Sequence, residues 1–462
     1  MRNELKEYDL DWTLWSILNL ASKVGVASDK ELQGMLSMLP SRKGLLDALL
    51  QHRKPGTLFL EMAGNYFQHL MDAHAEGKKV CMNSFCFPPE ICFALDIIPV
   101  FPEIITAFGT LIWERGMYEF QDYANEMGLT DTSCSAQRGG AGGFLAGLVA
   151  KPDMIVSNTP GVCDTNSTVV AFMSEYLKVP YFQIDWPPSV SDERALEYQR
   201  QDFRNMIAFL EEQSGDKLQE DKLREVCEQS RQMDERLVEL HELRTLVPSP
   251  VPNIFGLFEF ASRYVAGGTP ECNSLLEAML EASRERAEKG LGPGPGERAR
   301  GFFVYVSHFT QDAKFWTWLE DQGITHLGET LNFFYQKSAP YAGGKGYAMD
   351  TTNMDTMIDS LADQMASYPM IRTIRGPYDA PDQWAEQIAR QVKAYKTDFV
   401  CYIGTMACRN SWGAAKLLSR YVEDELNIPS LIIYADAWDD RVMSWETVKD
   451  KLSEFLEMRV LA

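Results

Sequence analysis

The sequence predicts an α/β protein built on parallel sheets, and two observations carry this prediction. From Lys79 onward, short apolar segments alternate with helical segments, which is the pattern of strands joined by crossover helices. In addition, one arrangement of strand, cysteine, helix and strand occurs twice in the chain. The predicted strands are Val80–Ser84, Ile97–Phe101, Asp153–Ser157, Tyr181–Asp185, Phe302–Ser307, Asp398–Ile403 and Ser430–Tyr434.

The repeated arrangement starts at Asp153 and again at Asp398. A cysteine follows ten residues after each aspartate, at Cys163 and at Cys408. A helical segment then leads to a Val-Pro or Ile-Pro pair and the next apolar strand. The second copy is four residues longer between cysteine and proline, which is about one helical turn. We interpret this pattern as a duplicated structural unit.

Helical segments precede and separate the two α/β regions. The N-terminal part has helical spacing of apolar residues in Leu32–Leu50 and Leu58–His74. Charged helical sequence fills Glu193–Leu246, and the glycine- and proline-rich stretch within Glu288–Arg300 is typical of a loop or linker. The predicted divisions are 1–78 for an N-terminal helical segment, 79–190 for the first α/β domain, 191–300 for a helical insertion and linker, and 301–462 for the second α/β domain.

Charge and hydropathy restrict the partners and the location. The formal net charge of −22 disfavours nucleic acid and anionic membrane surfaces, because both repel a negative protein. The segment Met1–Tyr8 is charged, no signal-peptide cleavage site follows, and the apolar stretch Trp12–Val26 is too short and too polar to span a bilayer. We expect a cytoplasmic protein that binds neither nucleic acid nor membranes.

Three of the nine cysteines stand out by position. Cys163 and Cys408 follow predicted parallel strands, at the sheet edge where ligands bind, and they precede helices whose dipoles lower a thiol pKa. Cys134 precedes a glycine-rich run, and Arg138 would share a helix face with it and could offset negative charge. No Cys-x-x-Cys pair is present, so from spacing alone a three-cysteine metal site competes with ordinary buried cysteines.

Four segments of the chain together resemble the catalytic subunits of 2-hydroxyacyl-CoA dehydratases and ATP-dependent benzoyl-CoA reductases. They follow one another in family order across about residues 79–460. They are Ser84–Glu103 with two Pro-Glu pairs, Cys134-x-x-x-Arg138, Pro152–Asp185 with Cys163-Asp-Thr, and Ala407–Tyr434 with Cys408. The resemblance implies two flavodoxin-like domains with an N-terminal helical segment and helical insertions.

The resemblance also implies anaerobic iron–sulfur chemistry. Family subunits hold a [4Fe–4S] cluster on three cysteines, here Cys134, Cys163 and Cys408, with Arg138 and Ser84 near the cofactor. The implied partners are a second homologous catalytic subunit, a separate ATP-hydrolysing iron–sulfur activator, and an acyl-CoA substrate whose thioester accepts a low-potential electron to give a ketyl radical. Two alternatives stay open: a homodimeric, ATP-driven double-cluster reductase acting on a non-CoA small molecule, and a non-catalytic assembly subunit.

Glu103 is the candidate acid–base residue. The resemblance places it near the open iron site, and a carboxylate just after the buried strand Ile97–Phe101 would have its pKa raised by partial burial. The alternative is that Glu103 only caps a helix beginning near Ile104. Glu90 is interpreted as a charge stabilised at a helix N-terminus.

The chain departs from the dehydratase pattern in two places. Asp164 and Thr165 follow the second cysteine, where some dehydratase subunits have a Lys-Trp pair, and Phe85 stands where dehydratases carry a serine, with Ser84 beside it. Dehydration and ring reduction therefore both stay open. Aromatic residues that could form an apolar shell around a cluster are Phe85, Phe87, Phe101, Phe315, Trp316, Trp318, Phe333, Phe334 and Trp412.

Overall fold

Two four-stranded parallel sheets organise the protein. The computed structural model describes residues 50–113, 116–158, 163–186, 193–308, 313–372 and 381–462. The first sheet has the order β2-β1-β3-β4 and the second has the order β6-β5-β7-β8. The strands are β1 (Lys79–Asn83), β2 (Ile97–Val100), β3 (Met154–Ser157), β4 (Tyr181–Gln183), β5 (Ala299–Phe303), β6 (Ile324–Glu329), β7 (Phe399–Ile403) and β8 (Ser430–Ile433). The predicted class, two flavodoxin-like α/β halves, is confirmed.

The two sheets have equivalent strands in equivalent places. The central strands β1 and β5 each pair in parallel with the second strand of their half on one side and with the third strand on the other. Carboxyl ends of parallel strands meet at one edge of a sheet, which is where open α/β folds bind ligands. Each half therefore presents a loop after its first, second and third strand at a comparable position.

The sequence analysis misplaced one strand and missed another. β5 begins at Ala299, three residues before the predicted start, and β6 was not predicted at all. Both contain buried polar residues that interrupt the apolar pattern. The Arg300 guanidinium donates to the backbone oxygens of Tyr395 and Arg244 at 2.9 and 2.6 Å, and Thr325, His326 and Glu329 in β6 are likewise buried. Internal hydrogen bonds offset the cost of such burial, but they leave no apolar run for pattern analysis to detect.

Helices surround the sheets, and the element that follows each strand is a helix or, after β6, a 3-10 turn. In the first half they are α4 (Arg53–Asp72), α5 (Glu90–Ala94), α6 (Pro102–Ile112), α7 (Tyr118–Glu126), α8 (Ser135–Ala146) and α9 (Asp164–Leu177). In the second half they are α14 (Lys314–Asp321), the 3-10 turn η3 (Thr330–Asn332), α15 (Met354–Ala366), α16 (Pro369–Arg372), α17 (Pro381–Tyr395), α18 (Arg409–Leu426), α19 (Trp445–Phe455) and the π-helical turn η4 (Leu456–Val460). The predicted helical spacing in Leu32–Leu50 lies outside the described residues, except for its last residue.

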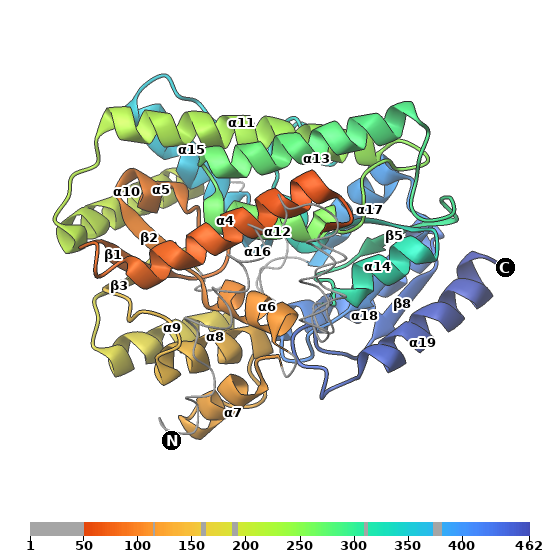
Figure 1. Ribbon diagram of the computed structural model, residues 1–462, viewed down its shortest axis with the longest axis horizontal. Coiled ribbons are helices and arrows are strands. Elements are labelled where there is room, and N and C mark those ends of the chain that lie inside the picture. The colour runs from red at the N-terminus through yellow and green to blue at the C-terminus, as the bar shows by residue number, and fades with distance from the viewer. Residues whose placement is uncertain (1–49, 114–115, 159–162, 187–192, 309–312, 373–380) are drawn as a thin grey trace, which may run out of the picture.

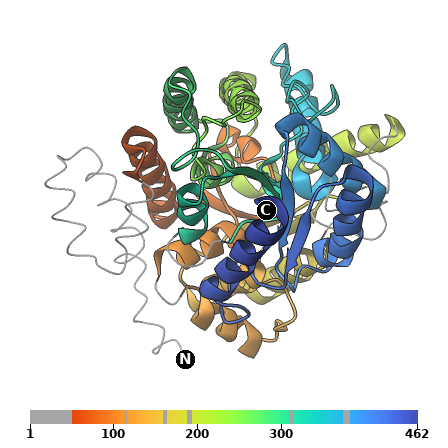
Figure 2. The same cartoon turned by 90° about the vertical axis from the view of Figure 1, so that its right-hand side faces the viewer.

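Four helices fill the chain between the two sheets. They are α10 (Glu193–Ser214), α11 (Glu220–Arg244), α12 (Phe255–Ala266) and α13 (Pro270–Glu288). The charged stretch expected to be helical is thus two helices, separated at Gly215, where φ is 83°. In Figure 1 the green helices α11 and α13 run side by side along the top of the molecule, above the orange first half and the blue second half, and Figure 2 shows the same helices nearly end-on. The predicted domain limits remain a prediction.

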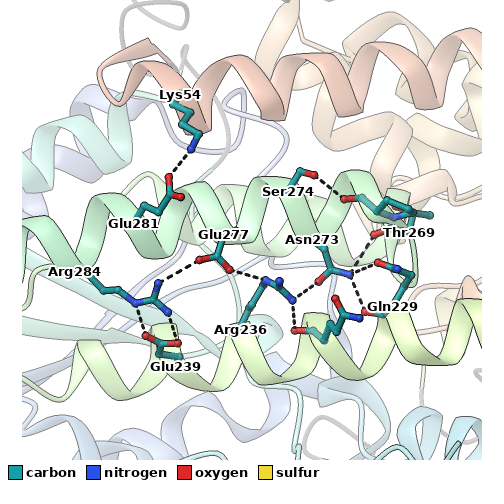
Figure 3. Close-up of polar contacts among 12 residues, drawn as sticks. Lys54, Gln229, Arg236, Glu239, Thr269, Asn273, Ser274, Glu277, Glu281 and Arg284 are labelled. Carbon is teal, nitrogen blue, oxygen red and sulfur yellow. Dashed lines mark hydrogen bonds and ion pairs between the residues drawn. The ribbon is translucent and has the colours of Figure 1, made fainter.

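Ion pairs on adjacent faces hold α11, α13 and α4 together (Figure 3). Arg236 on α11 donates to Glu277 on α13 at 3.0 Å, and Arg284 on α13 donates to Glu239 on α11 at 2.6 Å. Lys54 on α4 pairs with Glu281 on the opposite face of α13. These side chains are partly exposed, so each pair contributes little on its own, on the order of 0–1 kcal/mol. Together the pairs give the charged side chains of α11 and α13 partners on neighbouring helices.

Helix α12 is the element of this layer that reaches the interior. All of its residues are buried, and two buried ion pairs anchor it to α11: Arg244 with Glu259, and Arg263 with Asp234 at 2.8 Å. Tyr264 on α12 stacks on Phe85, which follows β1, with ring centroids 4.7 Å apart. Within the described residues, no helix is both long enough and apolar enough to cross a membrane.

Candidate functional site

Three helices begin at cysteines that face a common pocket. Cys134, Cys163 and Cys408 are the N-cap residues of α8, α9 and α18, and all three line one pocket. α9 follows β3 and α18 follows β7, so Cys163 and Cys408 come from equivalent loops of the two halves. The structure brings the three predicted cysteines together, and their role as metal ligands remains a prediction.

Burial dominates the electrostatics of these thiols. It raises the pKa of Cys134 and of Cys163 far above the usual thiol value, and the neighbouring Cys408 adds to both shifts. The expectation that a helix N-terminus lowers the pKa is therefore wrong for Cys163, because desolvation outweighs the helix. The helices still oppose the shift: the N–H of Asn166 donates to the Cys163 sulfur at 3.4 Å. The N–H groups of Ala136 and Gln137 favour the Cys134 thiolate without full hydrogen-bond geometry.

The three sulfurs do not converge on a single point. In the described part of the chain, no group of three His, Cys, Asp or Glu side chains is arranged to hold one metal ion. The pocket wall between the thiols is largely apolar, with Phe85 and Phe260 on the first-half side and Tyr305 and Trp438 on the other. Of the nine aromatic residues proposed as a shell, only Phe85 is among those that line the pocket.

Glu103 lines the pocket, and one of its two carboxyl oxygens accepts three hydrogen bonds. Its Oε1 accepts hydrogen bonds from the Phe85 N–H at 3.2 Å, from the Asn166 amide at 2.8 Å and from the Gln137 amide. Its Oε2 is buried and has no hydrogen-bond partner among the described residues. Burial raises the pKa of Glu103 to about 7, and the donors to Oε1 only partly offset that rise. A carboxyl group of this kind exchanges a proton near neutral pH.

The capping interpretation of Glu103 loses support from this geometry. Helix α6 begins at Pro102 after the N-cap Phe101, and no side-chain hydrogen bond caps it. The donors that hold Glu103 come instead from α8, from α9 and from the loop after β1. The interactions of Glu103 therefore tie the three loops around the pocket together.

Ser84 and Arg138 are buried, and their side chains form hydrogen bonds with residues that do not line the pocket. The Ser84 hydroxyl donates to Asn158 Oδ1 and accepts from the Asn158 N–H at 2.9 Å. The Arg138 guanidinium donates to the Ser133 carbonyl at 3.1 Å and to Asn125 at 3.2 Å. Neither side chain is among those lining the pocket. Their direct contact with a cofactor remains a prediction, and the structure gives both a role in holding the loops that carry Cys134 and Phe85.

The other cysteines are buried in the packing around the site. Cys401 lies in β7 and Cys227 in α11, as predicted, and the Cys86 sulfur contacts the Tyr264 hydroxyl at 3.4 Å. Glu90 differs from its interpretation as a simple helix-terminal charge. It begins α5, but it is fully buried and accepts hydrogen bonds from Ser230 at 2.7 Å and Gln364 at 3.0 Å. Glu90 therefore connects the first half to α11 and α15.

Several residues at the pocket were missed by the sequence analysis. Arg409 and Asp164 line it and form an ion pair of 2.7 Å across the two halves. Asp436 accepts a hydrogen bond from Ser135 at 2.5 Å, which joins the loop after β8 to the start of α8. These contacts link residues more than 240 positions apart. The helical position of Asp164 and Arg409 directly after a cysteine was the available indication, because it places both at equivalent helix starts.

The second half carries a buried carboxylate equivalent to Glu103. Glu329 ends β6, the counterpart of β2, and it accepts the Ser307 N–H from the loop after β5 at 2.5 Å. Its Oε1 is buried without a hydrogen-bond partner among the described residues, and burial raises its pKa to about 7. Glu329 is not among the residues that line the pocket.

Comparison with known proteins agrees with this arrangement. Residues 84–459 match the family described as 2-hydroxyglutaryl-CoA dehydratase, D-component. The chain is 23% identical to the alpha subunit of lactoyl-CoA dehydratase from Anaerotignum propionicum, over 90% of this chain and 99% of that protein. It is 22% identical to one of the subunits of benzoyl-CoA reductase from Thauera aromatica, over 86% and 92% of the two chains. The alpha subunit of (R)-phenyllactyl-CoA dehydratase from Clostridium sporogenes is 26% identical over 49% of this chain and 57% of that protein.

The match covers every strand except β1, which ends one residue before it begins, together with the helical layer between the sheets and all three pocket cysteines. The resemblance predicted from the four segments is confirmed, as is the prediction of an enzyme of the dehydratase and reductase type. The chain belongs to the 2-hydroxyglutaryl-CoA dehydratase D-component family.

Proposed function

We propose that this chain is the iron–sulfur subunit of an enzyme of the 2-hydroxyacyl-CoA dehydratase or benzoyl-CoA reductase type, with Cys134, Cys163 and Cys408 as the ligands of a [4Fe–4S] cluster. The observation that carries the proposal is the meeting of three cysteines, each at a helix N-terminus, in one pocket beside a carboxyl group with a free oxygen. When bound, such a cluster supplies a low-potential electron to a thioester carbonyl, giving a ketyl radical.

The donor set fits a cluster better than a mononuclear ion. Thiolates are the ligands of iron–sulfur clusters, and each thiolate of a cluster binds a different iron, so the three sulfurs need not converge on one point. Three helix N-termini directed at one pocket favour negative charge there. The raised thiol pKa values suit a site that ionises only when a metal group arrives, because a bound cation reverses the local pKa order.

The residues of the chain divide the remaining tasks. Phe85, Phe260 and Trp438 form apolar walls that exclude water from the pocket. The donors around Glu103 all bind Oε1, so Oε2 accepts no hydrogen bond among the described residues. The carboxyl group can therefore hold or release a proton near neutral pH. Arg409 and Asp164 stand at the exposed side of the pocket, where an acyl-CoA would enter between the halves.

The proposed partners follow from the names of the relatives. All three relatives are named as single subunits of larger enzymes, and two of them are alpha subunits, which supports a second homologous subunit for this chain. We also propose the ATP-hydrolysing activator as electron donor and an acyl-CoA as substrate. Co-purification with a second chain of similar size supports the two-subunit arrangement, and a homodimer would support the alternative of a double-cluster reductase.

Anaerobic purification with iron and sulfide analysis tests the cluster. We expect about four irons and four sulfides per chain in the wild-type protein. Cys134→Ala, Cys163→Ala and Cys408→Ala should each lose most of that content, because each removes one of three protein ligands. Cys272→Ala is the matched control, since Cys272 is buried in α13 away from the pocket. An iron-free wild-type protein, or full iron in Cys408→Ala, would contradict the proposal.

A further inference from the structure

The loop that follows β8 carries one wall of the pocket. It comprises residues 434–444, between β8 and α19, and is called the β8 loop below. Its Trp438 lines the pocket, is 4% exposed and has the largest side chain among the apolar lining residues. The loop belongs to the second half, but its hydrogen bonds reach α7 and α8 of the first half. The first half therefore helps to place a wall that the second half supplies.

Both backbone polar groups of Trp438 are hydrogen-bonded. Its N–H donates to Asp436 Oδ1 at 3.0 Å, and the same oxygen accepts the hydroxyl of Ser135 on α8 at 2.5 Å. Its carbonyl accepts from the amide of Gln121 on α7 at 3.4 Å. All three partners are buried, and a buried polar group is costly to leave without a hydrogen bond. These contacts therefore fix where the indole enters the pocket.

Gln121 joins the segments that meet at this point. It is completely buried, its Nε2 also donates to the Ser135 carbonyl at 3.3 Å, and its Oε1 accepts from the Arg441 guanidinium at 3.0 Å. Arg441 belongs to the β8 loop and also donates to both oxygens of Asp122 at 3.0 Å. Its guanidinium lies over the ring of Tyr118, 4.5 Å from the centroid. Helix α7 thus holds the β8 loop at two points.

The other apolar walls of the pocket are fixed in a different way. Phe260 belongs to α12, whose residues are all buried, and Phe85 stacks on Tyr264 of the same helix. Both are part of the close packing between the first half and α12, where a change of volume disturbs the core. Trp438 lies on a loop held by a rigid scaffold, which is where binding residues are concentrated in proteins. Its size can therefore vary with less effect on the fold.

We propose that Trp438 is a specificity-determining residue whose indole limits the size of the acyl group that the pocket admits, and that Gln121 is a positioning residue that holds Trp438 in place. An apolar pocket discriminates by volume, and one methylene group changes its preference by roughly 10–200-fold. The wild-type chain should therefore favour a compact acyl group over one that needs the space of the indole. The inference rests on the proposed function, since it requires an acyl-CoA in this pocket.

Trp438→Leu tests the inference with lactoyl-CoA and phenyllactyl-CoA, two thioesters that differ by one phenyl ring. The measurement is isothermal titration calorimetry of each thioester with the anaerobically purified enzyme. Leucine keeps the wall apolar but removes bulk, so we expect the ratio of the two Kd values to shift toward phenyllactyl-CoA by about tenfold. An unchanged ratio would overturn the inference. A shift toward lactoyl-CoA would overturn it too, because the indole would then bind the ring instead of excluding it.

Trp445→Leu is the matched control. Trp445 is as buried as Trp438, at 4% exposure, but it does not line the pocket. The same substitution there should leave the ratio of the two Kd values unchanged, and equal shifts in the two variants would contradict the inference. Trp438→Phe is a milder variant that keeps an aromatic side chain, and it provides the test if Trp438→Leu does not fold. We expect it to shift the ratio in the same direction by about threefold.

Gln121→Met tests the positioning role. Methionine has a similar length but cannot make the three hydrogen bonds of the amide, so Trp438 should lose its fixed place. We expect the ratio of the two Kd values to shift in the same direction as in Trp438→Leu, by about threefold. A lowered melting temperature with both thioesters weakened equally would show a merely structural role and would overturn the assignment of Gln121.

Binding by the wild-type enzyme separates failure of the inference from failure of the proposed function. A wild-type enzyme that binds neither thioester would defeat the proposed acyl-CoA function and the role of Trp438 with it. Binding of at least one thioester, with a Kd ratio that neither Trp438 variant changes, would defeat the role of Trp438 alone.

Discussion

The two halves of the protein share one strand order but offer different groups to the pocket between them. The first half supplies two thiols and a carboxyl group, from Cys134, Cys163 and Glu103. The second supplies one thiol and a phenol, from Cys408 and Tyr305. Equivalent positions have kept the backbone contacts and changed the side chain. The two halves thus present similar sheet edges to the pocket, and single residues at those edges divide the groups offered there.

The two halves differ most clearly in the position of their buried carboxyl groups, Glu103 and Glu329, relative to the pocket. Glu103 lies three residues beyond β2, and Glu329 is the last residue of the counterpart strand β6. Each accepts an N–H from the loop after the central strand of its half, and each has a pKa of about 7. They differ in their relation to the pocket, because Glu103 lines it and Glu329 does not. The same buried group is therefore an acid–base candidate in one half and a structural residue in the other.

The largest expected effect separates these two glutamates by turnover. Glu103→Gln removes the exchangeable carboxyl proton while keeping the acceptor oxygen, and a general acid–base group contributes typically about 10²–10⁴-fold. We expect single-turnover rates to fall by that range with iron content unchanged. Glu329→Gln is the control and should change the rate by less than about threefold. Equal rates in the two variants would remove the catalytic assignment of Glu103.

The sequence predicted the fold more completely than the site. Apolar strands and the repeated Asp-to-Cys spacing were sufficient for two parallel sheets, because buried parallel strands read as continuous apolar runs. The strand β6 was not predicted because it contains His326 and Glu329, which are buried but polar and make hydrogen bonds inside the protein. Such residues interrupt the apolar run by which a buried strand is recognised. The three cysteines stood out by their position at predicted helix starts and Glu103 by following a buried strand, and the family resemblance gave them their proposed roles. Asp436 was not identified, because its hydrogen bond to Ser135 joins the two halves, and the order of residues does not reveal such a contact.

The pH dependence of stability should report both glutamates. Their folded pKa of about 7 lies above the ordinary value of 4.5, so the folded state binds more protons between these values. Stability is therefore greatest at low pH within this window and is lost as the pH rises from about 4.5 to about 7, by up to about 3 kcal/mol for each group. Each Gln variant should show a smaller fall in melting temperature between pH 5 and pH 8. Melting curves that keep the wild-type slope in both variants would contradict the raised pKa values.

The smallest expected effect concerns the ion pair across the pocket opening. Arg409 and Asp164 are 65% and 49% exposed, so their coupling should be about 0.2–1 kcal/mol and should weaken with salt. A double-mutant cycle with Arg409→Gln and Asp164→Asn measures it. A coupling well above 1 kcal/mol would mean that the two halves are held closed at this point more firmly than the exposure of the pair suggests.

The placement of Cys408 has a consequence for how the protein is made. Cys163 and Cys408 are separated by 245 positions in the chain. At about 5–20 residues per second, ribosomes need roughly 10 to 50 s to reach the second cysteine after the first. During that interval Cys134 and Cys163 belong to a half-built site with no third thiol. On the proposed three-cysteine site, cluster insertion would follow synthesis of Cys408, and the nascent first half would carry two thiols without the third until then.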